Sequence, residues 1–106
     1  MAAETTKKQV TLIAVSKTKP AELLKEAYES GQRDFGENYV DELVEKASML
    51  PEDFRWHFIG HLQTNKVSSL MNIKNLECIQ SVDNLKLATK IEKKCEKLGR
   101  NLNVFV

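Results

Sequence analysis

The sequence predicts an α/β fold with a parallel sheet, because short apolar runs alternate with amphipathic helical segments along its 106 residues. The first run, residues 10–15, is almost continuously apolar, as is typical of a strand buried on both faces of a parallel sheet. Further short strands are predicted at residues 33–36, 55–60, 76–79 and 102–106. Each strand–helix unit therefore takes roughly 20 to 25 residues, a spacing that favours repeated βα units.

Helical segments fill the gaps between these runs. The first is expected to begin at Lys19-Pro20, because proline is tolerated at the first helical position, and to end at Ser30-Gly31. The second is expected to follow Asn38, a suitable N-terminal cap with Asp41 three residues later, and to end before Pro51.

The last two expected helices differ in length. A short helix is predicted from residue 65 to residue 71. A long one is predicted to begin at Asp83, as its cap, and to end at Gly99. It has the clearest amphipathic pattern in the chain, with apolar residues at helical spacing at Leu87, Ala88, Ile91, Cys95 and Leu98.

Five parallel strands suit two architectures. Eight such units would need about 200 residues, the lower end of a (β/α)8 TIM barrel, so the chain corresponds to the first half of one. Residues 1–106 would then form a single partial barrel domain of about four βα units and a fifth strand, whose end at Val106 leaves an apolar edge uncovered. Five strands also suffice for a complete doubly wound sheet of the flavodoxin type. Periodicity alone does not choose between these architectures.

Composition and charge argue against several classes of function. Sixteen basic and fifteen acidic residues give a net charge of +1, which offers no electrostatic basis for binding nucleic acid or an anionic membrane. No apolar run approaches the ~20 residues that span a bilayer, and the opening residues lack the apolar centre of a secretory signal. The two cysteines, Cys78 and Cys95, lack CxxC spacing and indicate reduced thiols in a cytoplasmic protein.

Candidate functional residues follow the predicted strands, because sites in parallel α/β folds form at the carboxyl ends of strands. Lys17 comes directly after the first strand and before a helix, where burial and the helix dipole both disfavour the ammonium form. A neutral amine is what Schiff-base chemistry with an aldehyde requires. Position alone also fits an ordinary solvated loop lysine, the commoner case for this residue type.

Other candidates have two interpretations each. His57 and His61 resemble a metal-binding pair, but four residues along a strand span about 13 Å, too far for one ion, so no metal site is predicted. His61, just beyond a strand end, is better placed for a site than His57. Asn38 and Asp83 are expected as helix caps, and Asn38 is also placed to meet a ligand. No nucleophile–base–acid set is recognisable, so no catalytic residue is predicted.

Three segments resemble the pyridoxal-5′-phosphate (PLP)-binding homeostasis family, also called the YggS-like family. They are AVSKTKP (residues 14–20), FGENYV (residues 35–40) and WHFIGHLQTNK (residues 56–66). All three occur in the family's order and at its spacing, and the match runs from about residue 12 to residue 106. Together they are far more specific than any one of them alone.

The resemblance implies a fold, a cofactor and a role. Members of this family are (β/α)8 barrels similar to the N-terminal barrel of alanine racemase, the fold-type III PLP proteins. Lys17, the first lysine of AVSKTKP, would hold PLP as a Schiff base, with Asn38 and His61 as cofactor neighbours. The family is associated with low free PLP and with delivery of PLP to apo-enzymes, without robust catalytic turnover. Its phosphate grip and pyridine-facing arginine come from later strands, which would lie beyond Val106.

Three alternatives remain open. An amino-acid racemase of the same fold type would need a second proton-transfer residue opposite Lys17, and none is available. A response-regulator domain would need an acidic cluster after the first strand and an aspartate after the third, where the chain has Ser16-Lys17 and Gly60-His61. An inert fragment would bind nothing and would pair its exposed edge with another copy, so self-association of the isolated chain is expected.

Overall fold

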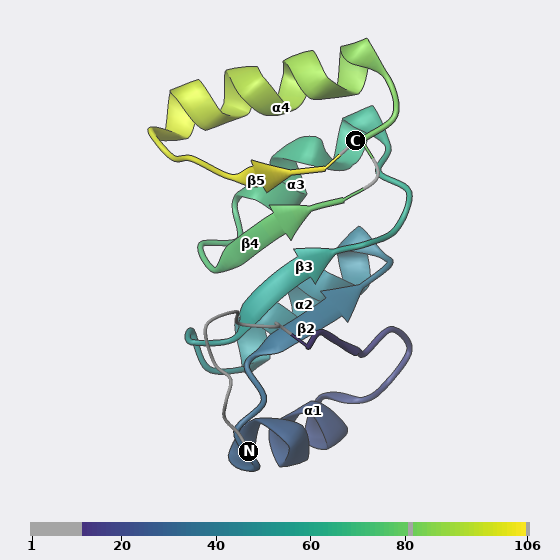
Figure 1. Ribbon diagram of the computed structural model, residues 1–106, viewed down its shortest axis with the longest axis vertical. Coiled ribbons are helices and arrows are strands. Elements are labelled where there is room, and N and C mark those ends of the chain that lie inside the picture. The colour runs from purple at the N-terminus through teal and green to yellow at the C-terminus, as the bar shows by residue number, and fades with distance from the viewer. Residues whose placement is uncertain (1–11, 81, 106) are drawn as a thin grey trace, which may run out of the picture.

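The computed structural model describes residues 12–80 and 82–105, which form a five-stranded parallel sheet with helices between successive strands (Figure 1). The predicted α/β alternation is therefore confirmed. In chain order the elements are β1 (Ala14–Val15), α1 (Ala21–Glu29), β2 (Asp34–Glu37), α2 (Val40–Met49), β3 (Arg55–Phe58), the 3-10 helix η2 (Thr64–Lys66), α3 (Val67–Met71), β4 (Leu76–Ile79), α4 (Leu85–Leu98) and β5 (Asn103–Val104).

The order of the strands in the sheet follows the order of the chain, β1-β2-β3-β4-β5, and every neighbouring pair is parallel. A flavodoxin-type sheet has the order 2-1-3-4-5. That alternative is therefore wrong for the five described strands. Because β1, β2 and β3 are neighbours, the segments that follow them lie side by side at the carboxyl edge of the sheet.

One face of the sheet packs against the helices, and α2 and α3 lie behind the sheet in Figure 1. Phe35 and Trp56 are register partners on this face. Both stack on Phe54, whose ring centroid lies 4.7 Å from that of Phe35 and 5.1 Å from that of Trp56. Each large apolar side chain buried in this way stabilises the fold by about 1.5–3 kcal/mol. The aromatic cluster thus fixes β2 against β3.

The opposite face of the sheet is polar near the amino ends of β2 and β3. The carboxylate of Asp34 accepts hydrogen bonds from Arg55 Nη2 at 2.7 Å and Arg55 Nε at 2.9 Å. His57 Nε2 lies 2.9 Å from Asp34 Oδ1. The Arg55 hydrogen bond and, after it, the one from His57 lower the pKa of Asp34 against the opposing effect of burial.

The first two helices begin one residue later than predicted. Pro20 lies immediately before α1 instead of within it. Asn38 is not the cap of α2, because Tyr39 intervenes with an extended backbone (φ −125°, ψ 125°) and the helix begins at Val40. A capping side chain must belong to the residue just before the helix to reach the free N–H groups of its first turn.

The long helix α4 also has a different cap from the predicted one. Asn84, and not Asp83, precedes the helix, and its side-chain oxygen accepts a hydrogen bond from Leu87 N at 2.8 Å. The predicted end is confirmed, because Gly99 adopts the left-handed conformation (φ 65°) that ends many helices. Among the described residues, no helix is both long and apolar enough to cross a bilayer, and α4 has only 14 residues.

The predicted strands agree with the observed ones to different degrees. β4 has the predicted bounds, and β2 lies one residue further along the chain than predicted. Strands β1 and β5 are two residues long in the described part of the chain. Residues 10, 11 and 106 of the predicted first and last strands lie outside the described residues.

Candidate functional site

The three predicted site residues follow three neighbouring strands, but only two of them share a pocket. Lys17 is exposed after β1, Asn38 is half-buried after β2, and His61 is exposed after β3. Asn38 and His61 line a pocket of about 380 Å3, and Lys17 is not part of its lining. Lys17 is exposed, as in the interpretation of this residue as a solvated loop lysine.

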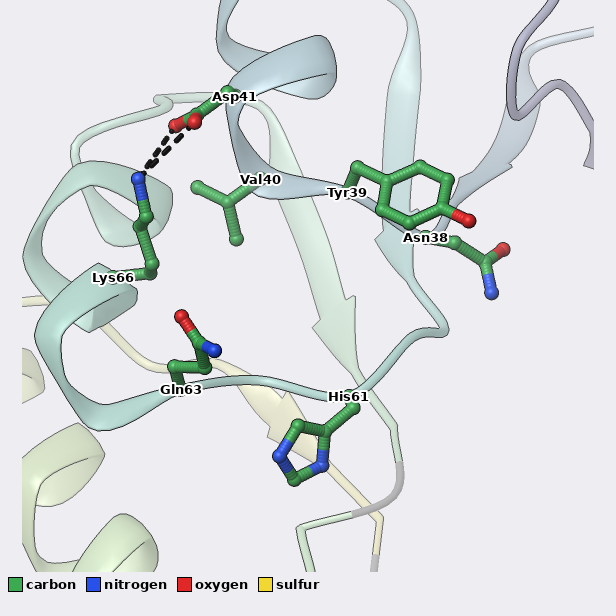
Figure 2. Close-up of a pocket in the computed structure, with 7 residues that line it drawn as sticks. All are labelled: Asn38, Tyr39, Val40, Asp41, His61, Gln63 and Lys66. Carbon is green, nitrogen blue, oxygen red and sulfur yellow. Dashed lines mark hydrogen bonds and ion pairs between the residues drawn. The ribbon is translucent and has the colours of Figure 1, made fainter.

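The pocket lies between the start of α2 and the segment that connects β3 to η2 (Figure 2). Its lining residues are mostly polar and include Asn38, Tyr39, His61 and Gln63. In Figure 2 the Gln63 side chain lies on the side of Val40 and Lys66, whereas the side chains of Asn38 and Tyr39 extend away from them. Lys66 closes one side, since its Nζ lies 3.0 and 3.1 Å from the two carboxylate oxygens of Asp41. The pocket therefore presents hydrogen-bonding groups from two separate segments.

The two walls of this pocket touch through their backbones at Gly60. A Cβ atom on Gly60 would lie 2.2 Å from the carbonyl oxygen of Asn38 and 2.8 Å from its Cα atom. No side chain larger than hydrogen fits at such a separation. Asn38 is thus held by direct contact, while its side-chain Oδ1 is buried and accepts no hydrogen bond from the described residues.

Lys17 occupies a tight turn. The N–H of Lys19 donates to the carbonyl oxygen of Ser16 at 3.1 Å, which closes a four-residue turn with Lys17 and Thr18 at its centre. Thr18 has a φ of 61°, the positive value that a type II turn requires at its third residue. Glycine or asparagine usually occupies that position, and a β-branched residue there is an outlier. Lys17 is therefore presented to solvent by a strained turn.

A buried charged cluster that sequence reasoning missed lies next to this turn. Lys46 Nζ donates to the carbonyl oxygen of Ser16 at 2.7 Å and to Glu37 Oε2 at 2.8 Å, and it lies 2.7 Å from Glu42 Oε2. Glu42 Oε2 also accepts a hydrogen bond from the N–H of Thr18 at 2.7 Å. Glu37 and Lys46 are 0% and 4% exposed, although glutamate and lysine side chains usually face solvent.

The two histidines face different surroundings. His57 is buried beside Asp34 on the polar face of the sheet, whereas His61 lines the pocket in Figure 2. Within residues 12–80 and 82–105, no group of three or more histidine, cysteine, aspartate or glutamate side chains is arranged to hold a metal ion.

The chain is similar in sequence to several proteins named pyridoxal phosphate homeostasis protein. The one from Bos taurus is 53% identical over 97 residues, covering 86% of this chain and 35% of the relative. The one from Schizosaccharomyces pombe is 44% identical over 99 residues, covering 93% and 42%. This chain spans 35–44% of the length of such relatives. No protein-family model matches the chain.

Solved structures show the same relationship. PipY of Synechococcus elongatus PCC7942, solved with PLP bound, has a TM-score of 0.81 and 42% identity, covering 90% of this chain and 45% of PipY. A protein of unknown function from Bifidobacterium adolescentis has a TM-score of 0.80 and 29% identity, covering 90% and 43%. By sequence and by fold, this chain belongs to the pyridoxal phosphate homeostasis protein family and corresponds to the N-terminal part of its members.

Proposed function

We propose that this chain carries the lysine-bearing part of a PLP-binding homeostasis protein, with Lys17 as the residue that binds the cofactor covalently. The observation that carries the proposal is the similarity to PipY, which was solved with PLP bound and matches 90% of this chain. Asn38 and His61, which line the adjoining pocket, are proposed as neighbours of the cofactor.

The described residues fit an aldehyde cofactor with polar substituents. Lys17 offers an exposed primary amine on a turn of defined conformation. Lys17 would hold PLP through the aldehyde group of the cofactor, which forms a reversible Schiff base with a primary amine and releases water. Asn38 contributes a buried carboxamide oxygen that accepts no hydrogen bond from the described residues. A buried polar atom without a partner costs free energy, and a ligand would recover this cost if the Asn38 side chain turned to expose the oxygen.

We also infer that the five strands are part of a (β/α)8 barrel. In such a barrel each strand pairs with the next strand of the chain, and that is the strand order of this sheet. The structural match to PipY covers less than half of PipY, which fits a partial barrel of about four βα units.

A carrier role is proposed in preference to a catalytic one. The relatives are named for homeostasis, and a carrier needs only reversible bonding to Lys17.

A cytoplasmic location is supported by the two cysteines, which form no disulfide with each other. Burial raises the pKa of the Cys78 thiol, so the thiol stays protonated and unreactive. Delivery of PLP to apo-enzymes and self-association stay predictions.

The test is covalent capture of PLP by the purified chain. The protein is titrated with PLP, the absorbance is scanned, the complex is reduced with borohydride, and peptides are mapped by mass spectrometry. The expected result is one dominant label on Lys17. Lys17→Ala should abolish this label, whereas Lys19→Ala should retain it, because both lysines are exposed in the same turn but only Lys17 is proposed to bind.

Labels scattered over several surface lysines would contradict the assignment of Lys17. An equal loss of labelling in Lys17→Ala and Lys19→Ala would also contradict the assignment of Lys17. Amino-acid racemisation faster than with free PLP would instead contradict the carrier role.

A further inference from the structure

We propose that Lys46 is a positioning residue that fixes the turn carrying Lys17, a role that rests on the proposed function of Lys17. The side chain of Lys46 is 5% exposed, and its ammonium contacts three oxygens. These belong to the Ser16 carbonyl group, the Glu37 carboxylate and the Glu42 carboxylate. The contacts to Ser16 and Glu37 are hydrogen bonds, and the contact to Glu42 is an ion pair.

The three contacts hold both sides of the turn. Lys46 binds the carbonyl oxygen of Ser16, the residue at which the turn begins. It also holds Glu42, whose carboxylate accepts the N–H of Thr18 from the middle of the turn. Thr18 is the residue with the unfavourable positive φ. The hydrogen bond from its N–H to Glu42 therefore stabilises the turn at the residue whose backbone is strained.

The charges explain why Lys46 controls the geometry of its neighbours. Glu37 is fully buried, and Ser16 Oγ donates to the same Glu37 oxygen that Lys46 binds. One ammonium therefore lies between two carboxylates. Without it, Glu37 would be a buried charge without a counter-charge, and Glu42 would gain more by turning to water than by holding Thr18.

Lys46 also links the Lys17 turn to the pocket. It lies on α2, the helix that begins at Val40, two residues after Asn38. Helix α2 thus sets the position of the Lys17 turn through Lys46, and its first residue lies two positions after Asn38. The positions of Lys17 and Asn38, two of the three proposed cofactor-binding residues, are therefore coupled through α2.

The experiment removes the ammonium while keeping the buried charge balanced. Lys46→Met combined with Glu37→Gln eliminates both buried charges, so the variant is expected to fold. Lys90→Met, on an exposed part of α4, is the matched control. The first readout is amide hydrogen exchange by NMR at Thr18, compared with Trp56, whose N–H donates to Asn75 in the sheet. The second is the ratio of borohydride-trapped PLP on Lys17 to that on Lys19.

Exchange at Thr18 is expected to rise about tenfold in the double variant, as for loss of one hydrogen bond, while exchange at Trp56 and in the control stays unchanged. The Lys17:Lys19 labelling ratio should fall by about the same factor. A general loss of stability would raise exchange at both amides equally. A folded double variant with the original Thr18 exchange and the original ratio would overturn the proposal. If the unaltered chain does not label Lys17, the proposed function fails, and Thr18 exchange still decides the role of Lys46.

Discussion

The turn after β1 and the turn after β3 lie at the same edge of the sheet but are held by different forces. The first presents Lys17 and is held by the buried charges of Lys46, Glu37 and Glu42. The second leads from Gly60 to His61 and is held by contact between its backbone and that of Asn38. The Lys17 turn therefore depends on the buried ammonium of Lys46. The Gly60 segment depends on the lack of a side chain at Gly60.

The difference shows how one edge can combine a strained element with a rigid one. The Lys17 turn contains a threonine at positive φ and needs several hydrogen bonds to keep that conformation. In the Gly60 segment the backbone lies so close to that of Asn38 that no side chain fits, and the N–H of Ile59 donates to the carbonyl oxygen of Glu37 at 2.9 Å. A turn held by buried charges therefore lies at the same edge of the sheet as a segment held by close packing.

The largest effect is expected from Gly60→Ala. The new methyl carbon would lie 2.2 Å from the Asn38 carbonyl oxygen, so one of the two backbones must move. We expect the free energy of unfolding to fall by ~3 kcal/mol, the upper range for overpacking, measured by urea denaturation. The labelling of Lys17 by PLP should be little affected in the folded variant, because the Lys17 turn is held by Lys46 and Glu42 and not by Gly60.

Gly99→Ala is the control for this substitution. A Cβ atom at Gly99 meets nothing within 4 Å, so only the left-handed backbone opposes the change. Its expected cost is about 1 kcal/mol. Equal losses for the two variants would mean that the contact between Gly60 and Asn38 does not hold the pocket.

A smaller effect is expected at the amino ends of the same strands, where charges hold β2 to β3. Arg55 and His57 lower the pKa of Asp34, so the stabilisation is present above the unfolded-state pKa of about 3.9 and is lost as pH falls through the lower folded-state value. We expect Asp34→Asn to cost ~1 kcal/mol at pH 7, a modest value because Arg55 is half-exposed. Urea denaturation at several pH values checks this. The deficit should shrink as the pH approaches 3, and a deficit independent of pH would contradict the ionic origin.

Much of the fold could be predicted from the sequence, because the alternation of apolar runs and amphipathic segments reflects local forces. The bounds of β4 and the end of α4 at Gly99 depend on apolar patterning and on one glycine conformation, and both were predicted correctly. The order of the strands was not predicted by periodicity, since strand pairing is a long-range property. The observed caps lie one residue later than the predicted ones, because Tyr39 and Asn84 still have an extended backbone and the helices begin only after them.

The candidate site was less predictable than the fold. Position after a strand identified Lys17, Asn38 and His61, but it did not show that Lys17 lies outside the pocket of the other two. Burial of Lys46 and Glu37 could not be inferred, since lysine and glutamate are usually solvated. One available signal was the i,i+4 spacing of Glu42 and Lys46 directly after the FGENYV segment. The positive φ of Thr18 had no signal at all, because threonine rarely adopts it.

The smallest expected effect tests the strain in the Lys17 turn. Thr18→Asn places a residue that tolerates positive φ at the position that requires it. We expect a gain of ~0.5–1 kcal/mol in the free energy of unfolding, because the left-handed conformation costs a β-branched residue more than it costs asparagine. Lys19→Asn, in the same turn but without a positive φ, should leave the stability unchanged. A loss on Thr18→Asn would show that the threonine side chain contributes more than its backbone conformation costs. A gain would instead show that the buried charges of Lys46 and Glu42 hold the turn against its own strain, which the steric hold at Gly60 does not have to do.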